Sequence, residues 1–250
     1  MTEQASELFL REVSIDWEAI PADSYLRTIS ALSSLRQLCF HKPVTFFAGE
    51  NGSGKSTLLE AIAVACGFNP EGGSRNYCFS TYDSHSSLCH AVRLVRGSRP
   101  VKWGYFLRAE SFYNVATAEE EYARFSRTGS EAYHKRSHGE SFLHLVQKNF
   151  TGDSLYLLDE PEAALSPQRQ LTLLLEIERC ARAGAQFLIA SHSPILLGLP
   201  DAELLCFDGG EIHACAYEET ESYRVTEMFV RRREQILRQL FAADSADSND

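Results

Sequence analysis

Residues 49–56 read GENGSGKS and contain the residue types that can hold a phosphate group. The three glycines allow backbone angles that turn successive amide groups toward an anion. An apolar stretch precedes the segment and a helical pattern follows it, so the positive end of the helix adds to the attraction. Lys55 can reach the β- and γ-phosphates of a nucleotide, and the Ser56 hydroxyl can ligate Mg²⁺. The complete pattern G-x-x-x-x-G-K-[ST] therefore predicts nucleotide binding rather than an ordinary glycine turn.

The predicted contacts with ATP form one continuous segment. They are Gly49, Glu50, Asn51, Gly52, Ser53, Gly54, Lys55, Ser56 and Thr57. Lys55 is also expected to act in catalysis, because its charge would lie beside the phosphate that is transferred.

A second segment, LYLLDE at 155–160, is an apolar run that ends in two acids. We predict that Asp159 holds Mg²⁺ together with Ser56. Glu160 lies one residue further, where a carboxylate can orient an attacking water or accept its proton. A strand that merely ends in a charged turn is the alternative, and the phosphate loop earlier in the chain argues against it.

Buried strands that alternate with helical patterns must position these groups. We expect strands at 7–15, 43–49, 91–96, 101–108, 154–158, 185–190, 203–208 and 211–217. Helices are expected from 55, from about 139, over 167–183 and over 224–241. The pattern predicts one α/β domain over 1–241, with a mostly parallel central sheet and an antiparallel β portion. A short helical region is expected at about 110–150, and a polar, disordered tail at 242–250.

Composition and charge narrow the classes of function that are possible. The chain has 250 residues and a formal net charge of −10, so nucleic acid binding is not indicated, although a local basic patch at 231–233 leaves it open. No apolar run is long enough to span a membrane, and we expect a cytoplasmic protein. The seven cysteines show no CxxC pair, so we expect reduced thiols.

Three further segments resemble the ABC-type ATPases. DEPEAALSP at 159–167 is similar to their Walker B and D-loop segment. SHSP at 191–194 resembles the segment that carries their switch histidine, and SHGES at 137–141 resembles a divergent signature motif. The order of these elements along the chain is the ABC order, which disfavours a GTPase, a kinase or a hexameric AAA+ ring.

The resemblance implies a P-loop NTPase fold of the ABC ATPase head type and a homodimer that forms on ATP binding. In such dimers each ATP is held by one phosphate loop and by the signature of the other head. By this resemblance, Ser137 and Gly139 would contact the partner's ATP, and His192 would contact the γ-phosphate within its own head and support catalysis. Ala164, Leu165 and Ser166 would form the D-loop between the subunits.

Some positions depart from the ABC pattern. The usual signature Leu-Ser-Gly-Gly-Gln is replaced by RSHGE at 136–140, which lacks one glycine and the glutamine. This change predicts slow turnover. Ser166 stands where the D-loop usually has Asp. Glu110 in FLRAESF is a candidate for the missing Q-loop glutamine, and an ordinary carboxylate at a strand end is the alternative.

The segments together resemble small stand-alone bacterial ATPases of the SMC, Rad50, RecF and OLD-like side, without a coiled-coil arm. We therefore expect a soluble, ATP-driven switch with an unidentified protein partner, in DNA metabolism or bacterial defence. One alternative is the nucleotide-binding subunit of an ABC transporter. Others are an ATPase partner of a separate nuclease or effector chain, and an ATP-binding protein with little turnover.

Overall fold

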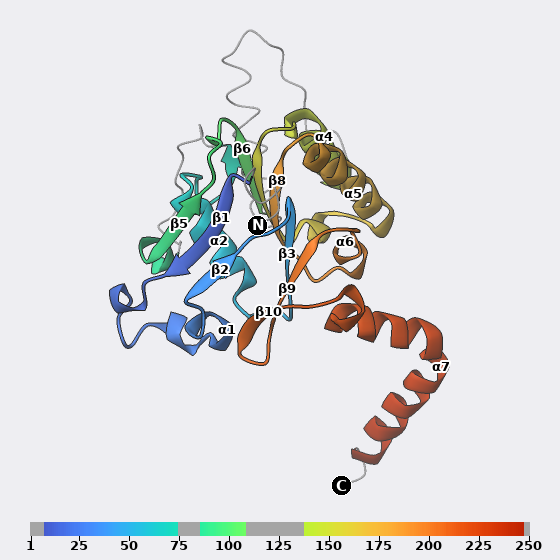
Figure 1. Ribbon diagram of the computed structural model, residues 1–250. Helices are drawn as coiled ribbons and strands as arrows, with labels where there is room; N and C mark the ends of the chain where they lie inside the picture. The colour runs from blue at the N-terminus through green and yellow to red at the C-terminus, as the bar shows by residue number, and fades with distance from the viewer. Residues whose placement is uncertain (1–7, 75–85, 109–137, 248–250) are drawn as a thin grey trace.

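The computed structural model describes residues 8–74, 86–108 and 138–247, and a seven-stranded sheet forms its centre (Figure 1). The strand order is β10-β9-β3-β8-β7-β6-β4. The five inner strands, β9, β3, β8, β7 and β6, are parallel to one another, whereas the edge strands β10 and β4 pair antiparallel with β9 and β6. Their bounds are β3 Val44–Ala48, β4 Gly73–Ser74, β6 Gly104–Arg108, β7 Leu155–Asp159, β8 Gln186–Ala190, β9 Glu203–Asp208 and β10 Glu211–Ala214. The predicted α/β class with a mostly parallel sheet is confirmed.

A second sheet forms the predicted antiparallel portion. It has the order β2-β1-β5 and is antiparallel throughout, with β1 Leu10–Ile15, β2 Gln37–Cys39 and β5 Val92–Arg96. Helix α2, Lys55–Ala65, contributes buried side chains to the same hydrophobic cluster as both sheets. This cluster fixes the helix that follows the phosphate loop, because burial of apolar surface is the main stabilising term.

Three helices cover the opposite face of the large sheet (Figure 1). They are α4 His138–Asn149, α5 Pro167–Arg182 and the short α6 Pro194–Leu197. Their buried side chains form a second hydrophobic cluster with alternate residues of the parallel strands. The alternation follows from the two-residue period of a strand, which sends successive side chains to opposite faces. Both faces of the parallel strands are therefore buried, which explains their continuous apolar sequence.

Three neighbouring strands end at the same edge of the sheet. In the registers of β3 with β8 and of β7 with β8, Phe47 and Asp159 both lie opposite Ala190. The phosphate loop follows Phe47 and Ala48, the acidic pair ends β7, and the SHSP segment follows Ala190. Parallel topology thus brings together three segments that lie far apart in the sequence.

The structure differs from the sequence-based expectations in several places. It adds α1, Ser30–Ser33, and short 3₁₀ helices at Trp17–Ala19, Tyr25–Thr28, Ser87–His90, Pro161–Ala164 and Tyr217–Glu219. The last helix, α7, runs over Glu221–Asp247, so residues 242–247, expected as a disordered tail, are helical. Figure 1 shows α7 extending away from the sheets, with a change of direction where Arg232 has non-helical backbone angles.

Two further observations bear on the sequence analysis. Cys206 and Cys215 form a disulfide, which contradicts the expectation that all cysteines are reduced. Composition could not show this, because the pairing depends on the register of β9 with β10. None of the helices in the described ranges combines the length and apolarity of a membrane span.

Candidate functional site

The phosphate loop between β3 and α2 requires its glycines. Gly49, Gly52 and Gly54 have φ angles of 143°, 82° and 101°, a region that favours glycine. A Cβ at Gly49 would lie 2.8 Å from the Phe207 carbonyl oxygen, and one at Gly54 would lie 2.7 Å from Ile29 Cγ2. The loop is therefore held in its curved form both by backbone conformation and by close packing.

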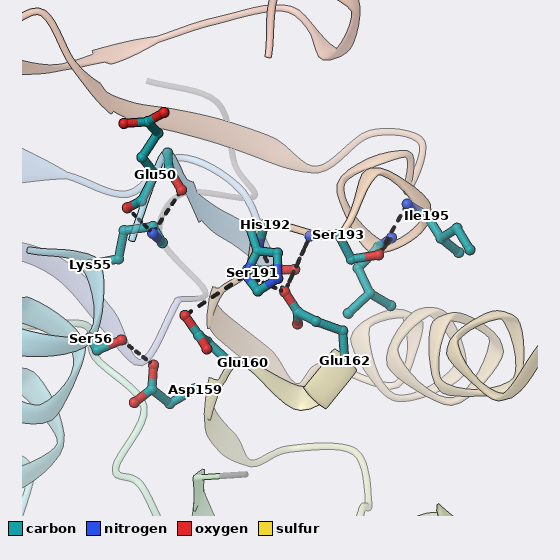
Figure 2. A network of polar contacts seen from close by, with 12 residues as sticks. Glu50, Lys55, Ser56, Asp159, Glu160, Glu162, Ser191, His192, Ser193 and Ile195 are labelled. Atoms are coloured by element: carbon teal, nitrogen blue, oxygen red, sulfur yellow. Dashed lines mark hydrogen bonds and ion pairs between the residues drawn. The ribbon is translucent and has the colours of Figure 1, made fainter. Parts of the chain in front are cut away.

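Lys55 begins α2 and points back into the loop. Its Nζ donates hydrogen bonds to the carbonyl oxygens of Gly49, at 2.7 Å, and Glu50, at 2.6 Å (Figure 2). The residue is only 3% exposed. Burial lowers the pKa of Lys55 from its usual value, and the nearby carboxylates of Glu160 and Asp159 offset part of this shift. Among the described residues, Lys55 thus bonds to two loop carbonyl groups and to no carboxylate, and it is held beside the phosphate loop.

Ser56 and Asp159, the two predicted Mg²⁺ ligands, lie in direct contact. Ser56 Oγ donates a hydrogen bond to Asp159 Oδ1 at 2.7 Å (Figure 2). Asp159 Oδ2 lies 3.5 Å from Nε of Arg108, which ends the neighbouring strand β6. Arg108 Nη1 also lies 2.6 Å from Glu60 Oε2 on α2. The Ser56 hydroxyl and the Arg108 guanidinium therefore help to position the carboxylate of Asp159.

Glu160 has a backbone conformation that is unusual for a residue other than glycine. Its φ of 48° and ψ of 50° are left-handed, and its N–H donates to the Ala190 carbonyl at 3.0 Å. Pro161 follows at once and begins a 3₁₀ helix, so the chain turns sharply after β7. The turn leaves the Glu160 side chain 33% exposed, next to the buried Asp159. Such strain at a strand end is typical of functional sites.

The SHSP segment is held by a carboxylate to which the sequence analysis assigned no role. Glu162 Oε1 accepts hydrogen bonds from Ser191 Oγ at 2.8 Å, from the N–H of His192 at 2.7 Å and from the N–H of Ser193 at 3.2 Å. Figure 2 shows Glu162 directed at this segment, with His192 between Glu162 and Glu160. His192 Nδ1 lies 3.3 Å from Glu162 Oε1 and 3.8 Å from Glu160 Oε1. Glu162 thus positions the histidine at the acidic end of β7.

A pocket of about 690 Å³ opens beside the phosphate loop. Residues 48–53 and His192 line one part of it, and residues 206–209 together with the first turn of α7 line another. The predicted contacts Gly49 to Ser53 therefore face this pocket, whereas Gly54 to Thr57 lie outside its lining, at the start of α2. Its volume is within the range of small-molecule sites.

The predicted signature residues are only partly described. Ser137 and the Q-loop candidate Glu110 lie outside the described residues. Gly139 lies in the first turn of α4 and packs against its own chain, where a Cβ would lie 2.7 Å from Arg169 Nη1 and 3.0 Å from the Ala164 carbonyl. Gly139 does not line the pocket beside the phosphate loop. The fold therefore places the start of α4, where the signature is predicted, next to the predicted D-loop, Ala164 to Ser166.

Two residues of this site were missed by the sequence analysis. Glu162 is the third acid of the DEPE segment at 159–162, and this extra acid was a visible signal. Arg108 lies opposite Asp159 in the register of β6 with β7. The sequence gives no such register, so nothing in the spacing of these two residues could have identified the pair.

The residues present fit a bound magnesium nucleotide. The hydroxyl of Ser56 and the carboxylate of Asp159 are oxygen ligands of the kind that Mg²⁺ prefers. The loop supplies backbone amides at a helix N-terminus and a lysine, which together suit a polyphosphate. The buried Ser53 Oγ has no hydrogen-bond partner within the described residues and faces the same loop.

Comparisons with known proteins identify similar domains. A family model described as AAA domain matches residues 27–153, just over half of the chain. A second AAA domain model, whose description refers to AbiEii toxin and type IV TA systems, matches residues 141–198. In Mycobacterium tuberculosis, the ABC transporter ATP-binding/permease protein Rv1747 is 24% identical over 191 residues, which are 69% of this chain and 22% of that protein. The chain thus spans about a fifth of the length of this relative.

Two solved structures are similar in fold. CbiO1 from Clostridium perfringens, part of an ABC transporter complex, has a TM-score of 0.50 and 14% identity, covering 93% of this chain and 99% of that one. The SMC head domain from Thermotoga maritima has a TM-score of 0.45 and 15% identity, covering 83% and 98%. The similarity to cbiO1 supports an ATP-binding cassette fold for the chain.

Proposed function

This chain belongs to the AAA domain family of ATPases, and we propose that it binds and hydrolyses Mg-ATP as a homodimer that serves as an ATP-driven switch. One observation carries the proposal. The phosphate loop, the Ser56–Asp159 pair and the Glu160–His192 pair all lie at one edge of the sheet. These are the groups that binding, metal coordination and water activation require.

The residues of the chain have distinct tasks in this scheme. The amides of residues 49–54 bind the phosphates, and Lys55 exchanges its two carbonyl acceptors for phosphate oxygens. Ser56 and Asp159 hold Mg²⁺, which when bound neutralises charge on the phosphates. Glu160 accepts a proton from the attacking water. His192 donates a hydrogen bond to the transferred phosphate, in an orientation set by Glu162.

Dimerisation completes the site in this proposal. Gly139 lies outside the pocket of its own chain, although the resemblance to ABC ATPases assigns it a phosphate contact. A second copy that closes over the phosphate loop would supply the signature helix in trans. Exposed apolar side chains on α7, among them Val225, Phe229 and Val230, also favour an assembly with another protein surface.

The Glu160→Gln variant tests the proposal. It should bind ATP, hydrolyse it at least about 100-fold more slowly and accumulate as a dimer, because the proton acceptor is lost while the binding loop is intact. Light scattering after size exclusion should give twice the chain mass of 28.0 kDa with Mg-ATP and the single mass without it. Lys55→Ala, as a control, should remain monomeric. A Glu160→Gln protein that binds ATP and stays monomeric would contradict the dimer, and one that binds no ATP would contradict the whole proposal.

For the biological setting we propose a bacterial defence module with an effector partner. The family model that covers residues 141–198 supports this setting, because its description refers to AbiEii toxin and type IV TA systems. A transporter subunit is the second candidate, because Rv1747 and cbiO1 are both named as ABC transporter components. Affinity purification of Glu160→Gln with ATP distinguishes the two, since recovery of a membrane permease would favour the transporter.

A further inference from the structure

The β9–β10 hairpin carries four potential metal ligands on one face. Cys206 and Asp208 lie on β9, His213 lies on β10 and Cys215 follows it. One ligand atom from each of Cys206, Asp208 and His213 lies within 4.8 Å of the others. The Sγ of Cys215 is bonded to that of Cys206, so it lies directly beside this group of three.

The hairpin geometry explains why these four residues meet. Cys206 and His213 are direct partners in the antiparallel register, and the turn between the strands is Gly209-Gly210, with φ angles of 54° and 84°. Asp208 is two residues after Cys206, and Cys215 is two residues after His213. Residues two apart on a strand share a face. The spacing C-x-D-x₄-H-x-C is therefore a property of the hairpin register and not a chance approach of surface side chains.

The four groups have the chemistry of a zinc site. Zn²⁺ prefers four ligands drawn from thiolate, imidazole and carboxylate. Ligand atoms on a tetrahedral Zn²⁺ lie about 3.5 Å apart, so Cys206, Asp208 and His213, whose ligand atoms lie within 4.8 Å of one another, need only small side-chain rotations to reach this geometry. Cys215 would complete the set once its bond to Cys206 is broken. Two thiolates, one imidazole and one carboxylate would complete the coordination without water.

We propose that the β9–β10 hairpin is a redox-gated Zn²⁺ site, in which Cys206, Asp208, His213 and Cys215 bind the ion once the disulfide is reduced. The disulfide and the metal exclude each other, because a sulfur in an S–S bond has no thiolate charge to donate. A dithiol reductant opens the site: it transfers two electrons and two protons to the disulfide and is itself oxidised to a disulfide. Zn²⁺ then displaces the two thiol protons as it binds.

The position of the cluster allows an ion to enter. Cys206 is 4% exposed, whereas the side chains of Asp208 and His213 are 60% and 43% exposed. The buried thiolate would anchor the ion, and the two exposed ligands would close over it from solvent. His213 Nδ1 already lies 3.5 Å from Asp208 Oδ1, so these two groups converge without a metal.

The site adjoins the pocket beside the phosphate loop but shares no ligand with the proposed ATPase site. Cys206 and Asp208 line that pocket, and Cys206 is the register partner of Ala48, the last residue of β3. Ser56 and Asp159, the proposed Mg²⁺ ligands, are not members of the cluster. Metal binding to the hairpin can therefore be tested without any measurement of ATP turnover.

The test uses the full-length chain and Co²⁺ as a spectroscopic probe for Zn²⁺. Protein reduced with a phosphine, which becomes the phosphine oxide and does not compete as a dithiol would, is titrated with Co²⁺ without oxygen. We expect one equivalent to bind, with the intense visible bands of tetrahedral Co²⁺ and a near-ultraviolet thiolate-to-metal band. Added Zn²⁺ should remove both, and protein with the disulfide intact should show neither.

Variants identify the ligands. Cys215→Ser and His213→Ala should each weaken Co²⁺ binding at least about tenfold. His213 is exposed, so its variant tests the site without disturbing the core. Cys39→Ser is the matched control, because Cys39 is a free, exposed cysteine on β2, and its titration should be unchanged. Failure of the reduced protein to bind Co²⁺ with a thiolate band, or unaltered binding in Cys215→Ser, would overturn the proposal.

Discussion

The hydroxyl of Ser56 donates a hydrogen bond to the carboxylate of Asp159 at 2.7 Å, although 103 residues separate them in the sequence. Ser56 lies in the first turn of α2 and Asp159 ends β7. The contact exists because β3 and β7 both pair with β8 in parallel and end at the same edge. It aligns two oxygen groups that can ligate one cation.

Removal of the Asp159 charge should lower the apparent affinity of the site for Mg²⁺. Asp159→Asn keeps an oxygen acceptor for Ser56 but loses the negative charge, so the apparent Mg²⁺ affinity in ATP turnover should fall about 10- to 100-fold. Turnover measured against Mg²⁺ concentration at saturating ATP checks this. Asp201→Asn, a change at an exposed loop aspartate, is the control. Equal Mg²⁺ dependence in both variants would show that Asp159 is not a metal ligand.

Glu162 should stabilise the segment that carries His192. Glu162→Ala removes the acceptor for Ser191 Oγ and for the two amides that follow, and unsatisfied buried donors cost about 1–3 kcal/mol. Glu162→Gln keeps one acceptor oxygen and should cost less. Urea denaturation measures the stability, and ATP turnover should fall in both variants because His192 loses its orientation. If the alanine variant unfolds at the same urea concentration as wild type, these hydrogen bonds contribute little.

Two glycines of the phosphate loop should respond differently to the same substitution. Gly54→Ala meets Ile29 and Leu32 at less than 3.0 Å and has a φ of 101°, so it should destabilise the fold by about 2–3 kcal/mol. Gly52→Ala has a φ of 82° but meets nothing within 4 Å, so it carries only the backbone cost of about 1 kcal/mol. Thermal unfolding of both variants compares the two costs. An equal loss of stability in the two variants would show that the close contacts at Gly54 add no cost.

ATP affinity should fall as the pH rises into the alkaline range. Burial lowers the pKa of Lys55 in the free protein, whereas a bound phosphate favours its charged form and raises that pKa again. Binding therefore takes up a proton once the pH exceeds the pKa of free Lys55, and affinity declines by up to about tenfold per pH unit there. Titrations with a fluorescent ATP analogue over about pH 7–10 would measure the decline.

The control for this effect is Lys55→Arg. A guanidinium stays charged throughout that range, so any binding that remains should show a flatter pH profile. A wild-type affinity that does not change with pH would mean that Lys55 keeps its proton in the free state. The same shift also affects folding: the cost of burying charged Lys55 is present below its folded-state pKa and is relieved as the pH rises toward 10.5.

Much of the candidate site could be predicted from the sequence because its motifs lie within short segments. The glycine positions of the phosphate loop, the acids that end an apolar run and the histidine after the next apolar run lie within short segments. The residue types follow from the structure of each segment. Glycines occur in the loop because it has positive φ angles, and the strand before it is apolar because both of its faces are buried. The parallel α/β class followed from the same alternation of strands and helices.

Contacts between different segments of the chain could be identified only in the tertiary structure. The pairing of Arg108 with Asp159 depends on the register of β6 with β7, and the disulfide of Cys206 with Cys215 depends on the register of β9 with β10. A one-residue slip would send every side chain of a strand to the other face, and spacing along the chain does not report the register. The sequence alone therefore determined the fold class and predicted the nucleotide-binding motifs. Folding decided which distant side chains orient Asp159 and His192, and that four potential metal ligands gather on one hairpin.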